Sequence, residues 1–132
     1  MALKESNESS LSVADHAVVG TIRYSSPEIL NGERLTLAGC KAADIYAASI
    51  TINEMFLEEQ PFDGLNQHQL RRAVLKGERP EPSNDSEHRV PRILRVLLEQ
   101  AWSERINERP SADSFLKMFK KMKPSLSVDE YY

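Results

Sequence analysis

Apolar positions are densest between residues 41 and 57, a stretch that contains neither glycine nor proline. Its apolar side chains fall on several sides of a 3.6-residue helical wheel, and small residues fill the remaining positions. A helix that is apolar nearly all round is buried, so the pattern predicts a central helix that the other elements surround. The stretch is too short and too polar to span a membrane. Asp44 lies in its first turns, and a carboxylate that enters a core needs hydrogen-bond partners.

Two shorter helices carry start and stop signals in the sequence. Ser26 as N-cap and Pro27 at the first helical position predict a helix of one to two turns, which Gly32 ends. Asn66 is predicted to cap a second helix, because Gln69 three residues later completes a capping box. A glycine follows that helix directly and ends it.

Two amphipathic helices are predicted in the last third of the chain. Pro91 opens the first, whose apolar stripe consists of Ile93, Leu94, Leu97, Leu98 and Ala101. Ser111 caps the second, whose inward residues are Phe115, Leu116, Met118, Phe119 and Met122. No alternating strand pattern is present, so the sequence predicts a mainly α fold of about five helices.

Composition narrows the class of protein further. The chain has 132 residues, of which 40% are hydrophobic, which suits one folded domain. The formal net charge of −3 gives no support for a nucleic-acid or membrane partner. The chain has a single cysteine, Cys40, which excludes an intramolecular disulfide and is expected to be a small buried or boundary thiol. One cysteine and three scattered histidines also make a structural zinc site improbable. Residues 1–12 contain no apolar run, so no signal peptide is expected, and the expected location is cytoplasmic, with the nucleus as the alternative.

Five motifs in order resemble the C-terminal lobe of a eukaryotic protein kinase domain. They are Val19-Gly20-Thr21-Ile22-Arg23-Tyr24-Ser25-Ser26-Pro27-Glu28, then Asp44-Ile45-Tyr46 with Glu54-Met55, Pro61-Phe62, Ala101-Trp102 and Asn107-Glu108-Arg109-Pro110. The resemblance covers nearly the whole chain. The Trp102 and Arg109-Pro110 pattern is similar to the tyrosine-kinase and tyrosine-kinase-like branches, and Gly20-Thr21 resembles the serine/threonine type. The chain therefore looks like a tyrosine-kinase-like serine/threonine kinase.

The resemblance implies three regions. Residues 1–25 would be the activation segment and substrate (P+1) loop, residues 26–123 the helical C-lobe, and residues 124–132 a flexible acidic tail, with the N-terminal β lobe absent. The substrate-binding residues would be Val19, Gly20, Thr21, Ile22, Arg23, Tyr24 and Ser25. Candidate activating phosphosites are Ser6, Ser9, Ser10 and Ser12, in a Ser-rich segment that otherwise is simply solvated.

The same resemblance implies interaction partners for four charged or polar residues. Glu28 would pair with Arg109, the alternative being that both are solvated surface charges. Asp44 would accept hydrogen bonds from the backbone of a catalytic loop. Thr21 would hydrogen-bond the catalytic Asp and Lys of that loop, or else be an ordinary loop threonine. Both residues would support catalysis without being catalytic themselves.

Kinase motifs missing from this sequence limit the implied function. It contains no Gly-rich loop, strand lysine, His-Arg-Asp or Asp-Phe-Gly motif, which in the family bind ATP and Mg²⁺ and supply the base. A complete parent domain would transfer the ATP γ-phosphate to serine or threonine of a protein substrate. This chain alone would be inactive, would need no cofactor and would have the missing N-terminal kinase half as a partner. It is expected to begin just inside an activation segment, as a truncated product, an incomplete gene model or a deliberate fragment.

Three departures from the family pattern leave a second function open. Ser26 replaces the usual Ala, Ser49 the usual Gly, and Thr51 a large apolar residue, although a threonine can simply bond the carbonyl one turn earlier. The parent could thus be a pseudokinase, and the lobe an interaction module that binds a protein partner through its uncovered apolar surface. The isolated chain is then expected to be poorly stable or self-associating, with Asp44 unpaired.

Overall fold

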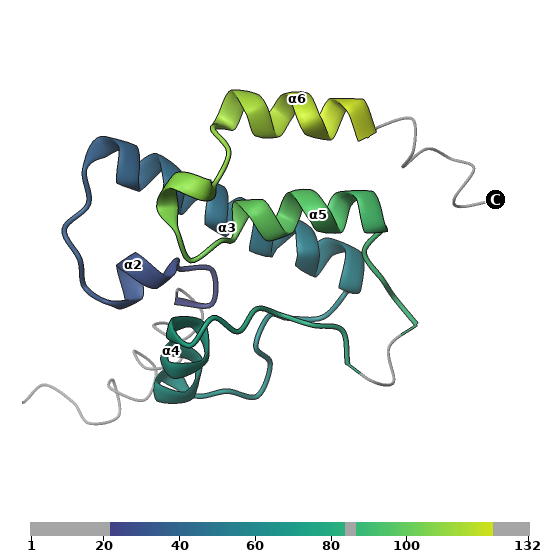
Figure 1. Cartoon of the computed structure of the whole chain (residues 1–132). Coiled ribbons are helices and arrows are strands. Elements are labelled where there is room, and N and C mark those ends of the chain that lie inside the picture. Colours follow the sequence, from purple (N-terminus) through teal and green to yellow (C-terminus); the bar gives the residue numbers. More distant parts are fainter. Residues whose placement is uncertain (1–21, 84–86, 123–132) are drawn as a thin grey trace, which may run out of the picture.

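The computed structural model describes residues 22–83 and 87–122, and within these ranges the chain is entirely helical apart from its loops (Figure 1). The elements are α2 (Pro27–Leu30), α3 (Leu37–Leu57), α4 (Gln67–Leu75), α5 (Arg92–Ala101), the short 3-10 helix η2 (Ile106–Glu108) and α6 (Ala112–Met122). No strand occurs among the described residues. The predicted mainly α fold is confirmed.

Several predicted residues fall outside the described ranges. They are the four serines Ser6, Ser9, Ser10 and Ser12, the substrate-segment residues Val19, Gly20 and Thr21, and the tail 124–132.

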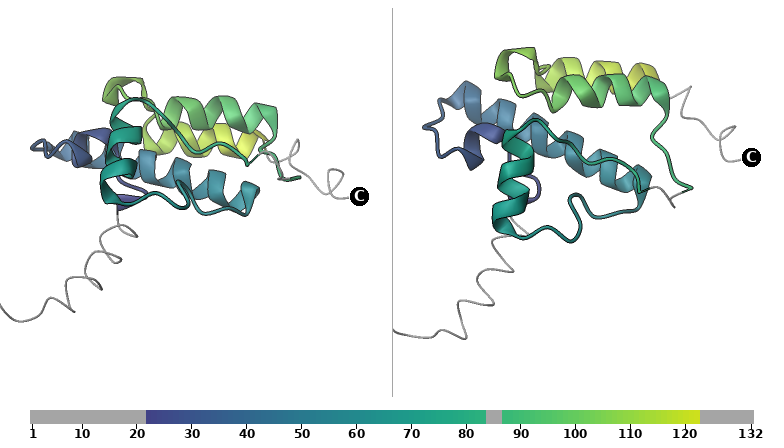
Figure 2. Two further views of the ribbon diagram at one scale, coloured as in Figure 1. Left: turned by 90° about the horizontal axis from the view of Figure 1, so that it is seen from below. Right: turned by 60° about the horizontal axis from the view of Figure 1, so that its bottom comes forward.

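Helix α3 runs through the middle of the molecule, and α5 and η2 pack directly against it (Figures 1 and 2). α5 packs against α3, α6 packs against α5, and α2 contacts α4. The core between these elements contains Tyr46 and Ile50 of α3, Leu70 of α4 and Leu94 and Leu98 of α5, each fully buried. None of the described helices is both long and apolar enough to cross a membrane.

The central helix begins four residues earlier than the pattern of apolar positions predicted. Thr36 is the N-cap, and its side chain accepts a hydrogen bond from the backbone N–H of Gly39 at 3.1 Å. The glycine made this stretch look like a loop, but a threonine cap lets the helix include Gly39 and Cys40. The helix ends at Leu57, and Glu58 follows in the left-handed region with φ 55°.

The prediction that α3 is buried on nearly all sides is wrong. Leu37 and Met55 expose 74% and 70% of their surface, and Asp44 is exposed as well. Asp44 has no hydrogen-bond partner among the described residues, so it does not enter the core. The physical reason is that the packed helices cover only the side of α3 that contains Tyr46 and Ile50. Cys40 is also exposed, not buried.

The caps of the later helices match their sequence signals. Asn66 and Gln69 form a reciprocal capping box, with N···O distances of 2.9 and 3.0 Å. Ser111 Oγ accepts a hydrogen bond from Ser114 N at 3.2 Å at the start of α6. Two residues assigned to inward stripes are instead exposed: Ile93 at 48% and Leu116 at 51%, because each lies at the edge of its stripe.

Candidate functional site

A buried ion pair joins two segments that lie 81 residues apart in the sequence. Arg109 Nη1 and Nη2 donate to Glu28 Oε2 and Oε1 at 2.7 and 2.8 Å, a bidentate arrangement. The side chains of Arg109 and Glu28 expose 0% and 4% of their surface. Arg109 also donates to the carbonyls of Ala42 and Ser103, at 3.1 and 2.9 Å. One guanidinium therefore holds α2, α3 and the loop after α5 together.

The environment of Glu28 changes its acidity. Burial raises the pKa of the Glu28 carboxyl, but the hydrogen bonds from Arg109 and from nearby groups outweigh burial and hold the pKa below its usual value. Glu28 is consequently a carboxylate at neutral pH, as the pairing with a guanidinium requires.

The ring of the buried Tyr46 is close to the guanidinium groups of two arginines, one of which belongs to this pair. The guanidinium carbons of Arg79 and Arg109 are 5.2 and 5.3 Å from the centroid of the Tyr46 ring. Arg79 donates through Nε to the carbonyl of Trp102 at 2.8 Å. Burial raises the pKa of Tyr46 to about 12. The sequence contained no signal for Arg79 in this role, because its partners are ring faces and backbone carbonyls from other segments.

The described end of the predicted substrate segment is attached to the C-terminal half of α3. Tyr24 donates its hydroxyl hydrogen bond to Glu54 Oε1 at 2.5 Å. Arg23 Nη1 donates to the carbonyls of Pro61 and Phe62, at 2.8 and 3.0 Å. Burial and then the hydrogen bond and negative charge of Glu54 raise the pKa of Tyr24 to about 12. These contacts position residues 22–25 over the helix and the loop that follows it.

Glu54 and the Pro61-Phe62 pair were recognised from sequence only as motif residues, without partners. Their contacts to residues 23 and 24 span 30 to 39 residues of sequence. A local sequence pattern does not indicate contacts between such distant segments, so these partners could not be predicted from the pattern.

The two helix residues that depart from the kinase pattern are satisfied locally. Ser49 Oγ donates to the carbonyl of Tyr46 at 2.6 Å, and Thr51 Oγ1 donates to the carbonyl of Ala47 at 2.9 Å. The hydrogen bond predicted for Thr51 one turn back is confirmed. Neither residue leaves its hydroxyl unsatisfied inside α3.

Asp44 and Arg109 of the ion pair line the same hollow. The hollow, with a volume of about 640 Å³, is lined by the exposed Asp44 and Lys41 of α3, by Arg109 and by the start of α6. Asp44 thus lies near the ion pair without contacting it through a hydrogen bond among the described residues.

The sequence profile described as the protein kinase domain matches residues 2–119. The chain belongs to this family. Its Ser26-Pro27-Glu28 stretch supplies the glutamate of the buried pair, and Arg109 comes from the Asn107-to-Pro110 stretch.

Curated relatives of this kinase-domain chain include enzymes and a receptor. The chain is 33% identical over 109 residues to the serine/threonine-protein kinase mos of Gallus gallus, covering 81% of this chain and 30% of that protein. It is 33% identical over 117 residues to receptor-interacting serine/threonine-protein kinase 2 of Bos taurus, covering 84% of this chain and 21% of that protein. Atrial natriuretic peptide receptor 2 of Rattus norvegicus is 30% identical over 115 residues, covering 80% of this chain and 11% of that protein. The chain thus spans less than a third of the length of each of these relatives.

The family uses ATP and Mg²⁺, and the residues that the structure describes do not form a site that fits either of them. No group of three or more His, Cys, Asp or Glu side chains in the described ranges is arranged to hold a metal ion. A hollow of about 840 Å³ between the loops that follow α3 and α4 contains five carboxylates among its lining residues, which would repel the phosphates of a nucleotide.

Proposed function

We propose that this chain forms the substrate-binding, C-terminal-lobe part of a tyrosine-kinase-like serine/threonine kinase domain. In the complete domain, the γ-phosphate of ATP would pass to a serine or threonine hydroxyl of a protein substrate. The observation that carries the proposal is the attachment of residues 22–28 to the helical body. Arg23, Tyr24 and Glu28 each make a long-range contact there, to the loop after α3, to Glu54 and to Arg109.

Catalysis by positioning explains why such contacts suit this function. Phosphoryl transfer depends on holding the acceptor hydroxyl in line with the phosphate, and a misplacement of about 1 Å can cost about 100-fold in rate. In the proposal, Val19 to Ser25 contact the substrate, and the bonds of Tyr24 and Arg23 keep this segment in one conformation. Glu28 and Arg109 fix the segment to the lobe. Asp44 and Thr21 support a catalytic loop, a role for which the exposed carboxylate of Asp44 is accessible.

Two further parts of the proposal concern regulation and specificity. Ser6, Ser9, Ser10 and Ser12 are candidate sites of activating phosphorylation, since a phosphate would give the segment a charge that arginines can bind. The names of two relatives support the serine/threonine type, because both are called serine/threonine-protein kinases.

A chimera tests the proposal. The matching 109 residues of the Gallus gallus kinase mos would be replaced by the corresponding residues of this chain, and transfer of radiolabelled phosphate from ATP to serine and threonine peptides measured. We expect transfer by the chimera and no binding of Mg²⁺-ATP by the 132-residue chain alone in isothermal titration. A chimera that ATP stabilises against thermal unfolding but that transfers no phosphate would contradict the proposal.

A second function is favoured by the uncovered side of α3. Leu37 and Met55 are among the most exposed large apolar side chains of the described ranges, and exposed apolar side chains of this size are available for contact with a protein partner. The lobe would then be a pseudokinase-like module that binds a protein through this surface. The inactive but ATP-stabilised chimera described above is the result that would favour this function over the first.

A further inference from the structure

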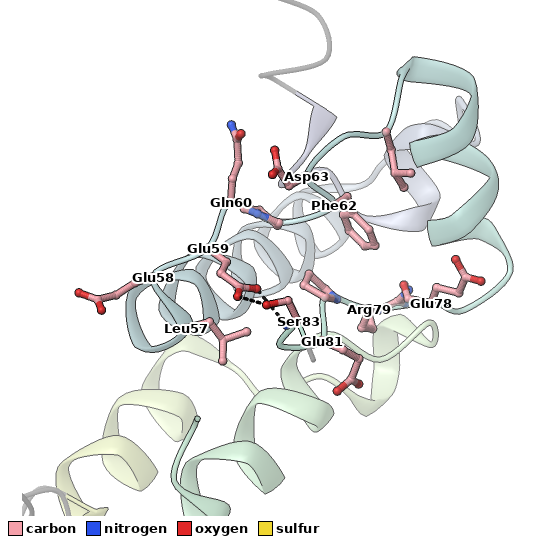
Figure 3. Close-up of a pocket in the computed structure, with 13 residues that line it drawn as sticks. Leu57, Glu58, Glu59, Gln60, Phe62, Asp63, Glu78, Arg79, Glu81 and Ser83 are labelled. Carbon is pink, nitrogen blue, oxygen red and sulfur yellow. Dashed lines mark hydrogen bonds between the residues drawn. The ribbon is translucent and has the colours of Figure 1, made fainter. Parts of the chain in front are cut away.

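A groove lies between the loop that follows α3 and the loop that follows α4 (Figure 3). Its volume is about 840 Å³, and its apolar lining comes from Leu57, Pro61, Phe62, Leu65 and Pro80. Glu59 of the first loop and Ser83 of the second meet through a hydrogen bond of 2.6 Å, which Figure 3 shows as a dashed line. The groove is large enough to accept one or two side chains of an extended peptide.

Carboxylates surround the apolar part of the groove. Glu58, Glu59, Asp63, Glu78 and Glu81 all line it. Arg79 is the one cation in the lining, and it forms no ion pair with these carboxylates among the described residues: its guanidinium donates to the carbonyls of Trp102, Val74 and Glu78 and lies over the Tyr46 ring. Five carboxylates in one groove are a marked local excess in a chain whose formal net charge is −3.

Two of these carboxylates are accessible to a partner. Glu58, Glu59 and Glu81 already contact His88, Ser83 and Arg95. The exposed side chains of Asp63 and Glu78 have no ion pair or hydrogen bond within the described ranges. Exposed ion pairs such as Glu81 with Arg95 contribute little to stability, so an incoming guanidinium can exchange with them at low cost.

Hydrogen bonds from Arg23 hold one wall of the groove, formed by Pro61 and Phe62, in place. Phe62 has a left-handed backbone conformation, with φ 53°, and Arg23 donates to its carbonyl and to that of Pro61. A wall that is already ordered loses little entropy when a peptide binds. The same hydrogen bonds connect this wall of the groove to Arg23.

We propose that this groove binds a segment of a protein partner in which an apolar side chain is flanked by arginine or lysine. The apolar lining would bury the anchor, and the carboxylates would accept hydrogen bonds from the flanking cations, which arginine can give in pairs. The negative charge of the carboxylates around the groove excludes acidic peptides, phosphopeptides and nucleic acids as ligands. The groove binds this segment whether or not the domain transfers phosphate, so the test requires only binding.

Fluorescence anisotropy with a synthetic peptide tests the proposal on the 132-residue chain. The labelled probe contains Leu-Phe flanked on each side by two arginines, and a matched probe carries glutamine in place of every arginine. The groove variant is Asp63→Lys with Glu78→Lys. The control variant is Glu33→Lys with Glu104→Lys, which makes the same change in net charge at a second hollow lined by these two carboxylates.

We expect saturable binding of the arginine probe, about tenfold weaker binding of the glutamine probe, and about tenfold weaker binding of the arginine probe to the groove variant. The control variant should retain the affinity of the natural chain within about threefold, and Asp63→Asn, which only removes a charge, should weaken binding by a smaller factor than the double reversal. Circular dichroism melting checks that each variant folds. No saturable binding below about 1 mM, equal affinity for the two probes, or equal losses in the groove and control variants would overturn the proposal.

Discussion

At the scale of single residues, Glu28 and Arg109 form the most deeply buried ion pair of the described ranges. Both charges lie out of water, so the geometry must compensate for a desolvation cost of several kcal/mol per ion. Two short hydrogen bonds between the side chains and two further bonds from Arg109 to carbonyls provide that compensation. Removing either side chain would leave the other charge buried without its partner.

Substitution of Arg109 by Ala is therefore expected to lower the free energy of unfolding by roughly 3–5 kcal/mol. Arg109→Lys should also destabilise, because an ammonium cannot form the bidentate bond. Urea denaturation followed by circular dichroism measures both. The control is Arg105→Ala, since Arg105 is exposed and its nearest carboxylate, Glu108, is 3.7 Å away. Equal losses in Arg109→Ala and Arg105→Ala would show that the buried pair contributes no more than a surface pair.

The same carboxylate predicts an acid limit for stability. Because the pKa of Glu28 is lower in the folded chain than in the unfolded chain, its ionised form favours folding. This contribution is complete above the unfolded value of about 4.3 and is lost as the pH falls through the folded pKa. We expect the free energy of unfolding to fall below about pH 4.5 more steeply in the natural chain than in Glu28→Gln. Urea midpoints measured from about pH 7 to about pH 3 test this, and parallel curves would contradict it.

At the scale of elements, helix α3 contains two threonines with opposite roles. Thr36 precedes the helix and satisfies the backbone N–H of Gly39, which has no partner within the helix. Thr51 lies inside the helix, is exposed, and bonds a carbonyl that already belongs to the helical ladder. The Thr36 hydroxyl caps the N-terminus of the helix, whereas the Thr51 hydroxyl bonds a carbonyl that already has a partner in the helix.

Alanine at these two positions should separate the roles. We expect Thr36→Ala to lower the free energy of unfolding by about 1 kcal/mol, the usual value for loss of an N-cap. Thr51→Ala should leave it unchanged or raise it by up to about 0.5 kcal/mol, because alanine is the better helix former. Urea midpoints of the two variants measure the difference. Destabilisation by Thr51→Ala as large as that by Thr36→Ala would mean that α3 depends on the side-chain bond to Ala47.

At the scale of the whole molecule, the exposed apolar side chains of α3 lead to an expectation about association in solution. The side of α3 that the described helices leave uncovered contains polar residues such as Lys41 and Asp44, and it also leaves the apolar side chains of Met55 and Leu37 in contact with water. Association between copies of the chain would remove that surface from water, with a gain proportional to its area.

We expect the isolated chain to self-associate with increasing concentration and Met55→Lys to reduce this association. The stability of Met55→Lys should stay within about 0.5 kcal/mol of the natural chain, since the side chain is exposed. Sedimentation velocity over a concentration series measures association. Gln100→Lys adds the same charge at an exposed polar position of α5 and should leave association unchanged. A monomeric natural chain at every concentration would contradict this prediction.

The sequence by itself determined the helical class and most helix ends, because caps and apolar periodicity are local properties. The caps formed by Asn66 with Gln69 and by Ser111 show this. The kinase-like motifs also predicted the pair of Glu28 and Arg109, which the structure contains. Thr36 was the exception, since the glycine after it obscured the helix start.

Only the tertiary structure decided which surfaces are covered and which distant groups meet. An apolar wheel does not indicate which side of a helix is packed, so the exposure of Asp44 and Met55 could not be read from it. The bonds of Arg23 to backbone carbonyls and of Tyr24 to Glu54 join segments at least 30 residues apart. Their geometry depends on how the chain folds back on α3, which no local sequence pattern contains.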